Sequence, residues 1–161
     1  MLKSTSPPAK GGPRSPEHSA ADRPAASSEV VRNRMARQGR RDTKAELALR
    51  RVVWRSGLRY RVDVAPLPGR RRADMVFTRA RVAVYVDGCF WHCCPVHGTI
   101  PKTNTDWWVA KLGGNVARDR DTDRRLEEAG WLVIRVWEHE GTTAAAARVI
   151  RAVGTDLRRS G

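Results

Sequence analysis

The sequence predicts a mixed α/β fold, in which helices flank a central sheet of mixed strand direction. The chain has 161 residues, enough for one domain with its own core, and short apolar runs bounded by turn residues alternate with helical segments. The expected elements are, in order, a helix over 43–56, strands over 58–64, 73–78 and 81–87, helices over 107–112 and 115–129, a strand over 131–137 and a helix over 142–157.

Capping and turn residues mark the first half of this order. Thr43 and Glu46 have the spacing of a capping box, which predicts the start of the first helix, and Gly57 predicts its end. The segment 66–69, Pro-Leu-Pro-Gly, is typical of a turn. The dipeptide at 79–80 separates two apolar runs, which we therefore expect to form an antiparallel hairpin.

Glycines and a threonine divide the second half. Two glycines at 113–114 are expected to interrupt or bend the helical region, because glycine has a low helix propensity. Gly130 predicts the end of the next helix, and the apolar run 131–137 is the strongest remaining strand. Thr142 is expected to cap the final helix.

The N-terminal part of the chain differs in composition from the rest. Residues 1–28 are rich in Pro, Ser, Ala and Gly and hold five of the nine prolines, so we expect them to be disordered. Residues 29–42 carry five arginines and are expected to form a basic arm that contacts DNA. A single folded domain is expected over 43–158.

The charge of the chain favours a polyanionic partner. Lys and Arg number 31 against 17 acidic residues, which gives a formal net charge of +14. Most of the basic residues are arginine, which suits phosphate contacts, whereas no basic amphipathic helix or bilayer-length apolar run favours a membrane. An odd number of cysteines with one vicinal pair is a poor disulfide framework, so we expect a cytoplasmic protein that binds nucleic acid.

A cluster of cysteines and histidines predicts a metal site. Cys89, Cys94 and His97 lie close together after an apolar run, and His139 follows the predicted strand 131–137. If that strand lies beside 81–87, the four residues form a Cys2His2 set for structural zinc. Cys93 is expected to point away, because adjacent residues on an extended chain face opposite sides. The alternative is ordinary buried thiols with a surface histidine.

Four further polar residues could carry catalysis. Asp74 and Asp87 stand at adjacent ends of the expected hairpin, where two carboxylates can hold Mg²⁺; alternatively each pairs with a neighbouring arginine. His92 can act as a general base or acid beside a phosphate; alternatively it supports a zinc ligand or replaces one. Glu46 can face the same metal, but its residue context alone favours the capping role.

The tryptophans fall into two groups. Trp54, Trp131 and Trp137 lie in regular elements and are expected to be in the core. The adjacent pairs at 90–91 (Phe-Trp) and 107–108 (Trp-Trp) are flanked by basic residues, so both members of a pair cannot point inward. Such aromatic residues can stack on bases or wedge between them, or cover the zinc site as an apolar lid.

Together these motifs resemble the very short patch repair (Vsr-type) mismatch endonucleases. The resemblance covers about residues 30–140 and is carried by Asp87-Gly88-Cys89-Phe90-Trp91-His92, preceded by Pro68-Gly69-Arg70 and Ala73-Asp74, and followed by Pro101-Lys102, Trp108, Lys111, Asn115, Arg118-Asp119 and Val136-Trp137-Glu138. It implies a restriction-endonuclease-like fold and a Mg²⁺-dependent enzyme. Such an enzyme acts as a monomer on double-stranded DNA. It nicks one strand 5′ of the T in a T·G mismatch left by deamination of 5-methylcytosine.

The resemblance also implies roles for individual residues. Asp74 would be the principal Mg²⁺ ligand beside the Val86 carbonyl, His92 the base or acid, and Glu46 its support. The wedge would be Phe90, Trp91 and Trp108, the zinc ligands Cys89, Cys94, His97 and His139, and the further DNA contacts Lys111, Asn115, Arg70, Arg71 and Arg72. The basic arm would clasp the other groove.

Two departures from the family pattern keep alternatives open. Asp87 stands where a histidine can occur in the family, so it is either a second Mg²⁺ ligand or an influence on His92. The acid-x-lysine half-motif of common restriction enzymes is absent after Asp87. A double-strand restriction-type nuclease and a non-catalytic zinc-containing DNA-binding module are the competing hypotheses. The bases around the mismatch, the paired methyltransferase and any repair partner are not encoded in recognisable motifs.

Overall fold

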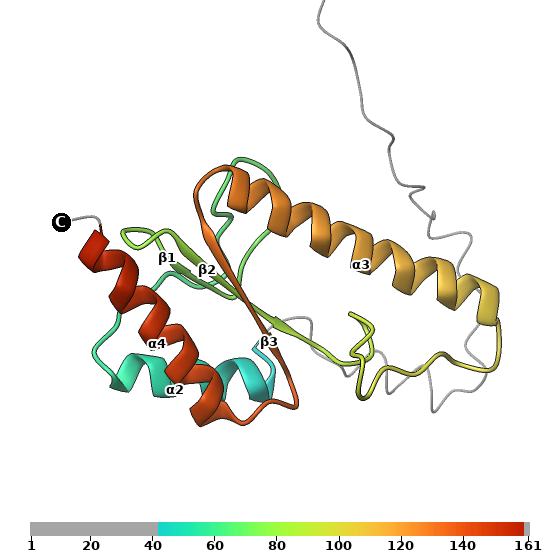
Figure 1. Cartoon of the computed structure of the whole chain (residues 1–161). Coiled ribbons are helices and arrows are strands. Elements are labelled where there is room, and N and C mark those ends of the chain that lie inside the picture. The colour runs from blue at the N-terminus through green and yellow to red at the C-terminus, as the bar shows by residue number, and fades with distance from the viewer. Residues whose placement is uncertain (1–41, 160–161) are drawn as a thin grey trace, which may run out of the picture.

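The computed structural model describes residues 42–159, with side chains as far as 154. The predicted tail 1–28 and all but the last residue of the arm 29–42 lie outside the described residues. The described elements are α2 (Lys44–Arg55), β1 (Met75–Phe77), β2 (Val82–Asp87), α3 (Thr105–Glu128), β3 (Leu132–Trp137) and α4 (Thr142–Arg159) (Figure 1).

The three strands form one mixed sheet in the order β1-β2-β3. β1 runs antiparallel to β2, as the hairpin prediction required, and β3 runs parallel to β2. The register places Met75 opposite Val84 and Tyr85 opposite Arg135. The prediction of a mixed sheet flanked by helices is therefore confirmed.

Helices cover both faces of this sheet. Alternate strand residues face opposite sides, and the core divides accordingly into two clusters. One contains Val84 and Ile134 with Leu49 of α2 and Val149 of α4, and the other contains Tyr85 with Leu126 of α3 and the neighbouring Trp131. Figure 1 shows α3 on one side of β3 and the pair α2 and α4 on the other.

The N-cap predicted at Thr43 is confirmed, and the reciprocal backbone bond of the capping box is shifted by one residue, from the Asp42 amide to the Glu46 carboxylate at 2.9 Å. The Thr43 hydroxyl accepts a hydrogen bond from the Glu46 amide at 3.3 Å and donates one to the Glu46 carboxylate at 3.0 Å. The helix ends at Arg55, and Gly57 follows with a φ of +90°. Only glycine adopts this conformation without strain, which explains the position of the stop.

The predicted strand over 58–64 was wrong. Within the described part of the chain, this segment makes only two isolated bridges, at Arg61 with Val76 and at Val64 with Ala73. Asp63 between them has a φ of +51°, which breaks the extended backbone that a ladder needs. Trp54 was also placed wrongly in the core: it is 50% exposed and lies under the guanidinium of Arg59.

The two glycines at 113–114 do not interrupt α3, which is continuous over 24 residues. Each glycine costs about 1 kcal/mol of helix propensity. Packing of Trp108, Leu112, Thr122 and Leu126, which are all buried, spans both sides of the glycines and outweighs that cost. Trp131 is 9% exposed as expected, and Trp137 is half-buried against the ring of His139. None of the described helices is long and apolar enough to cross a bilayer.

We predict that Gly113→Ala stabilises the protein by about 0.5–1 kcal/mol, because Gly113 lies in a helix interior where an added Cβ meets open space. Urea unfolding followed by circular dichroism measures the change. Gly57→Ala is the matched control and is expected to destabilise, because its φ of +90° disfavours any side chain. A loss of stability in Gly113→Ala would show that the helix bends at this residue.

Candidate active site and metal centre

The candidate site forms where the parallel strands β2 and β3 end. Asp87 and Trp137 are register partners at the last position of each strand, so the residues that follow lie at the same edge. The backbone amide of Glu138 donates to the Asp87 carbonyl at 3.0 Å, and the Glu138 carboxylate accepts from the Cys89 amide at 2.7 Å. These two bonds tie the start of the loop 88–104 to the end of β3.

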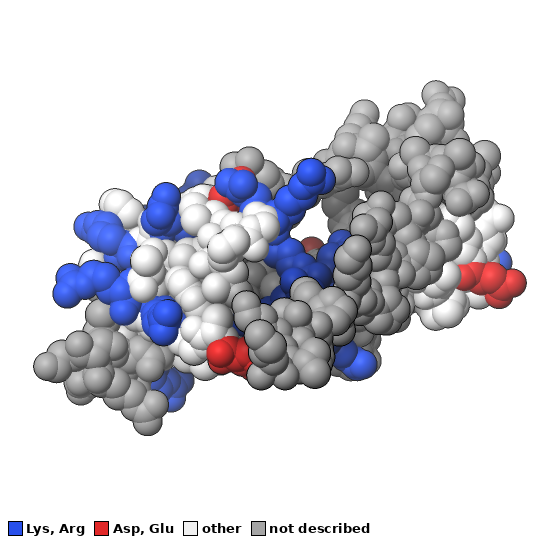
Figure 2. All heavy atoms as spheres, turned by 90° about the horizontal axis from the view of Figure 1, so that it is seen from above, with Lys and Arg blue, Asp and Glu red and all other residues white. Residues whose placement is uncertain are grey.

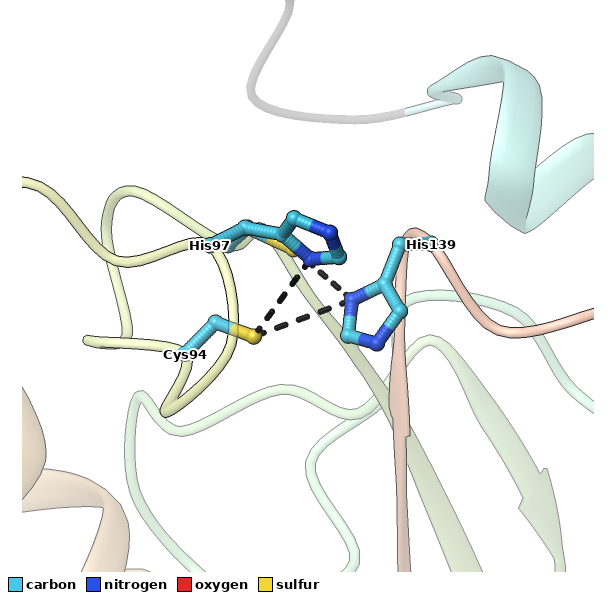
Figure 3. A group of neighbouring side chains, drawn as sticks. Cys94, His97 and His139 are labelled. Carbon is cyan, nitrogen blue, oxygen red and sulfur yellow. Dashed lines mark hydrogen bonds between the residues drawn. The ribbon is translucent and has the colours of Figure 1, made fainter.

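The structure brings the four predicted metal ligands together. The ligand atoms of Cys89, Cys94, His97 and His139 all lie within 4.8 Å of one another. The Nδ1 atom of His139 is 3.0 Å from the Cys89 sulfur and 3.7 Å from the Cys94 sulfur. Figure 3 shows Cys94 and His97 approaching from the loop and His139 from the segment after β3. Tetrahedral zinc places sulfur and nitrogen ligands roughly 3.6 Å apart, so this donor set fits a zinc ion.

Tight turns shape the loop around these ligands. The Cys94 amide donates to the Cys89 carbonyl at 2.9 Å, and the Gly98 amide donates to the Cys94 carbonyl at 2.7 Å. A Cβ at Gly98 would lie only 2.5 Å from that carbonyl oxygen, so glycine is required for the close approach. Cys93 is exposed, with a φ of +53°, and is not among the four clustered ligands.

The carboxylate of Asp74 lies in an unfavourable electrostatic position. Burial raises its pKa to about 6, a hydrogen bond from the Val86 amide at 2.7 Å partly offsets this, and the negative charges of Glu46 and Asp87 add to the increase. The hairpin therefore places Asp74 and Asp87 within electrostatic reach of each other, as predicted, and α2 adds Glu46. Three carboxylates that repel one another favour a bound cation.

His92 lies between two carboxylates. Its Nδ1 atom is 2.6 Å from the Asp119 carboxylate and 3.6 Å from that of Asp87. Burial lowers the pKa of His92, but the hydrogen bond to Asp119 and the two negative charges outweigh this effect and raise its pKa. A carboxylate on Nδ1 fixes the ring and leaves Nε2 as the nitrogen for chemistry.

Asp87 and Glu46 both have partners in the structure. Asp87 is 3% exposed and accepts from Arg135 Nη1 at 2.8 and 2.9 Å, which agrees with the alternative that this acid pairs with an arginine. Glu46, 4% exposed, accepts from Thr43 and from Arg50 Nη2 at 3.1 Å. Its capping role is thus present, while its charge still acts on Asp74.

An aromatic cluster adjoins the loop. The Phe90 ring centroid is 5.0 Å from that of Trp91 and 5.4 Å from that of Trp108. Trp108 is buried at 9% exposure, whereas Phe90 and Trp91 are only half-buried. The Asn115 side chain donates to the Trp91 carbonyl at 2.9 Å and so holds this part of the loop against α3.

Comparisons with known proteins agree with this site. A family model described as DNA mismatch endonuclease Vsr matches residues 26–97. The type II nicking enzyme V.NaeI of Lentzea aerocolonigenes is 47% identical over 123 residues, which cover 74% of each chain. The chain belongs to the Vsr family of DNA mismatch endonucleases. Vsr of Escherichia coli K12 is 43% identical over 100 residues, 61% of this chain and 62% of that protein. The type II nicking enzyme V.NmeDIP of Neisseria meningitidis serogroup C is 39% identical over 116 residues, 69% of this chain and 77% of that protein.

The basic surface of this Vsr-family chain is partly engaged by its own acids. Of the three arginines predicted to contact DNA at 70–72, Arg71 pairs with Asp121 at 2.7 Å and Arg72 with Asp63 at 3.0 Å, while Arg70 is exposed. Figure 2 shows that Lys and Arg nevertheless outnumber acidic residues over the described part of the face it presents. Such a surface suits the DNA on which this nuclease family acts.

The sequence analysis assigned no function to three residues of the site: Asp119, Arg135 and Glu138. Asp119 and Asp123 are four residues apart, which places both on one face of α3. Arg135 is the single charged residue of β3, a strand that is otherwise apolar. A lone arginine in an apolar strand was the available signal that a buried acid lies nearby.

We predict that Asp74→Asn stabilises the protein near neutral pH. The folded carboxyl keeps its proton up to a pKa of about 6, above its usual 3.8, so its contribution to stability falls as the pH rises between these values. Asn retains an oxygen for the Val86 amide and carries no charge. The variant should therefore gain up to about 3 kcal/mol over the wild type at about pH 7.5 and almost nothing at about pH 4.

Urea unfolding at both pH values, without added divalent cations, measures this difference. Glu127→Gln, at an exposed position of α3, is the control and should show a small change that does not depend on pH. An Asp74→Asn effect of equal size at both pH values would contradict the electrostatic explanation.

Proposed function

We propose that this protein nicks one DNA strand on the 5′ side of the T in T·G mismatches that arise from deamination of 5-methylcytosine, and so starts very short patch repair. The observation that carries the proposal is the position of His92. Its Nδ1 atom contacts the Asp119 carboxylate, and it lies beside the group of carboxylates. In the sequence it stands between Cys89 and Cys94, two of the clustered candidate metal ligands. The mixed sheet, with its acids at adjacent hairpin ends, supports assignment to the restriction-endonuclease-like fold.

The carboxylate group suits a catalytic Mg²⁺. Asp74, with the Val86 carbonyl beside it, would hold the ion, and Glu46 would support His92 or water bound nearby. Burial is the main cause of the raised pKa of Asp74, and repulsion from Glu46 and Asp87 adds to it; a divalent cation would offset both effects. When bound, Mg²⁺ supplies stabilisation of the negative charge that develops on the scissile phosphate.

His92 is the proposed general base or acid. Asp119 holds its Nδ1, so Nε2 is the atom that takes a proton from the attacking water or gives one to the leaving oxygen. This histidine takes the place of the lysine that common restriction enzymes use. The Asp87 carboxylate also acts on the Nδ1 atom of His92, at 3.6 Å.

The aromatic cluster is the proposed wedge at the mismatch. A T·G wobble pair stacks poorly, so separating it from its neighbour costs less than in matched DNA. Phe90 and Trp91 are half-exposed and would enter the duplex, with Trp108 beneath them. Selectivity would then come from the lower cost of deforming mismatched DNA.

The remaining basic and polar residues would hold the duplex. The proposed contacts are Lys111 and Asn115 on α3 and the arginines at 70–72 in the segment before β1. The arm 29–42 would clasp the other groove, and residues 1–28 would stay outside the folded domain. One active site per chain suits a monomer that cuts one strand.

The metal held by Cys89, Cys94, His97 and His139 is proposed to be structural zinc. We expect about one zinc ion per chain, and its loss in His139→Ala, because three ligands leave a tetrahedral site open. Metal analysis by mass spectrometry of purified protein tests this. Cys93→Ser is the matched control and should retain the ion. Equal zinc in His139→Ala and wild type would contradict the assignment of His139 as the fourth ligand.

A nicking assay tests the activity itself. End-labelled duplexes that differ only in one pair, T·G or C·G, are incubated with the protein and Mg²⁺ in several flanking contexts. We expect a single nick 5′ of the mismatched T, reduced by at least about a hundredfold in Asp74→Ala, because a lost metal ligand removes several kcal/mol of charge stabilisation. Glu127→Ala is the control and should cut at the wild-type rate.

The same assay separates the competing functions. Cleavage of both strands in matched DNA would indicate a restriction-type nuclease. Binding without cleavage, with or without Mg²⁺, would indicate a non-catalytic DNA-binding module and would contradict the proposed activity.

A further inference from the structure

The side chain of Arg135 connects two elements that border the candidate site. Arg135 is the register partner of Tyr85, and alternate residues of β2 point to one face, so Arg135 shares its face of the sheet with Tyr85 and Asp87. Its guanidinium lies 4.9 Å from the centroid of the Tyr85 ring. The same face of the sheet is covered by α3.

The guanidinium contacts three carboxylate residues. Nη1 donates to both oxygens of Asp87 at 2.8 and 2.9 Å. Nε and Nη2 each donate to Asp123 at 2.9 Å, and Nη2 also donates to the backbone carbonyl of Asp119 at 3.3 Å. The carboxylate of Asp119 lies 3.6 Å from Nη2. One planar cation thus links the end of β2 to one face of α3.

Two of these three residues are the acids that flank His92. Without a cation between them, Asp87 and Asp119 would repel each other at this short range and move apart. The guanidinium attracts both carboxylates and so reduces this repulsion. Its rigid fork of donors fixes the direction of the Asp87 carboxylate, and its bond to the Asp119 carbonyl holds the backbone of that residue. A lysine ammonium in this position would offer a point charge and could not hold β2 and α3 in the same geometry.

We propose that Arg135 is a positioning residue of the nuclease site, which holds Asp87 and Asp119 against His92 and so fixes the direction of the His92 ring. This inference rests on the proposed role of His92. It also assigns a role to Asp87, whose carboxylate, held by Arg135 at both oxygens, orients the histidine.

Arg135→Gln and Arg135→Lys test the inference in the full chain with its metals bound. The single-turnover nicking rate is measured at saturating T·G duplex and below the unfolding temperature of each variant. In Arg135→Gln this rate should fall about 10- to 100-fold, which is part of the rate enhancement that a positioned acid or base contributes. The dissociation constant for DNA should stay within about twofold, because the guanidinium is engaged by groups of β2 and α3. Arg135→Lys should recover part of the rate. Arg148→Gln is the matched control, since Arg148 donates to the backbone carbonyl of Arg135 and pairs with Glu140, which does not contact His92.

A second measurement does not depend on activity. Nitrogen-detected NMR of labelled histidine, with the His92 signal assigned through His92→Asn, reports the hydrogen bond at Nδ1. We expect this signal to change in Arg135→Gln and to stay as in the wild type in Arg148→Gln. If Arg135→Gln does not fold, Asp123→Asn is used instead, because it weakens only the ion pair between Arg135 and Asp123 of α3.

The outcomes separate this inference from the proposed function. An unchanged His92 signal, or a wild-type nicking rate in Arg135→Gln, would overturn the positioning role and leave the proposed function intact. A changed His92 signal in a protein whose wild type cuts no mismatch would uphold the positioning role and reject the proposed function.

Discussion

The parallel pairing of β2 with β3 is the constraint on which the site depends. This pairing aligns the last residues of both strands, so the chain leaves β2 and β3 at the same edge of the sheet. The loop after β2 supplies Cys89, Cys94, His97 and His92, and the segment after β3 supplies His139. An antiparallel pairing of the same two strands would send His139 to the opposite edge, away from a cluster that lies 45 to 50 residues earlier at Cys94 and Cys89.

The strongly basic chain uses some of its arginines inside the fold. Arg50 and Arg135 are largely removed from solvent, and each holds acids in place: Arg50 binds Glu46, and Arg135 binds Asp87 and Asp123. These pairs contribute little to stability on balance, because the desolvation of both partners opposes their attraction. Their value is geometric, since they keep several carboxylates in a small volume where the acids alone would separate.

Local patterns in the sequence were sufficient for part of this structure. The N-cap, the hairpin and the final strand each depend on neighbouring residues. The cluster of four candidate metal ligands needed only one long-range assumption, that the strand before His139 lies beside β2. The errors came from effects that act over longer distances. Packing on both sides of the glycines kept α3 continuous, and an arginine stacked on Trp54 made an exposed position acceptable for tryptophan. Asp119, which bonds His92, comes from α3, and Arg135, which holds Asp87, comes from β3. No spacing within the loop could indicate either residue.

The position of His92 within the metal loop also has a practical consequence. Cys89 lies three residues before His92, and Cys94 lies two residues after it, so the proposed general base and the ligand set share one short stretch of backbone. A chelator such as EDTA would therefore act on two ions with different roles. Loss of cutting after chelation would not identify Mg²⁺ as the cofactor, because an unfolded loop gives the same result. Only recovery of cutting by Mg²⁺ alone, in protein shown to retain its zinc, would distinguish the catalytic role of one ion from the structural role of the other.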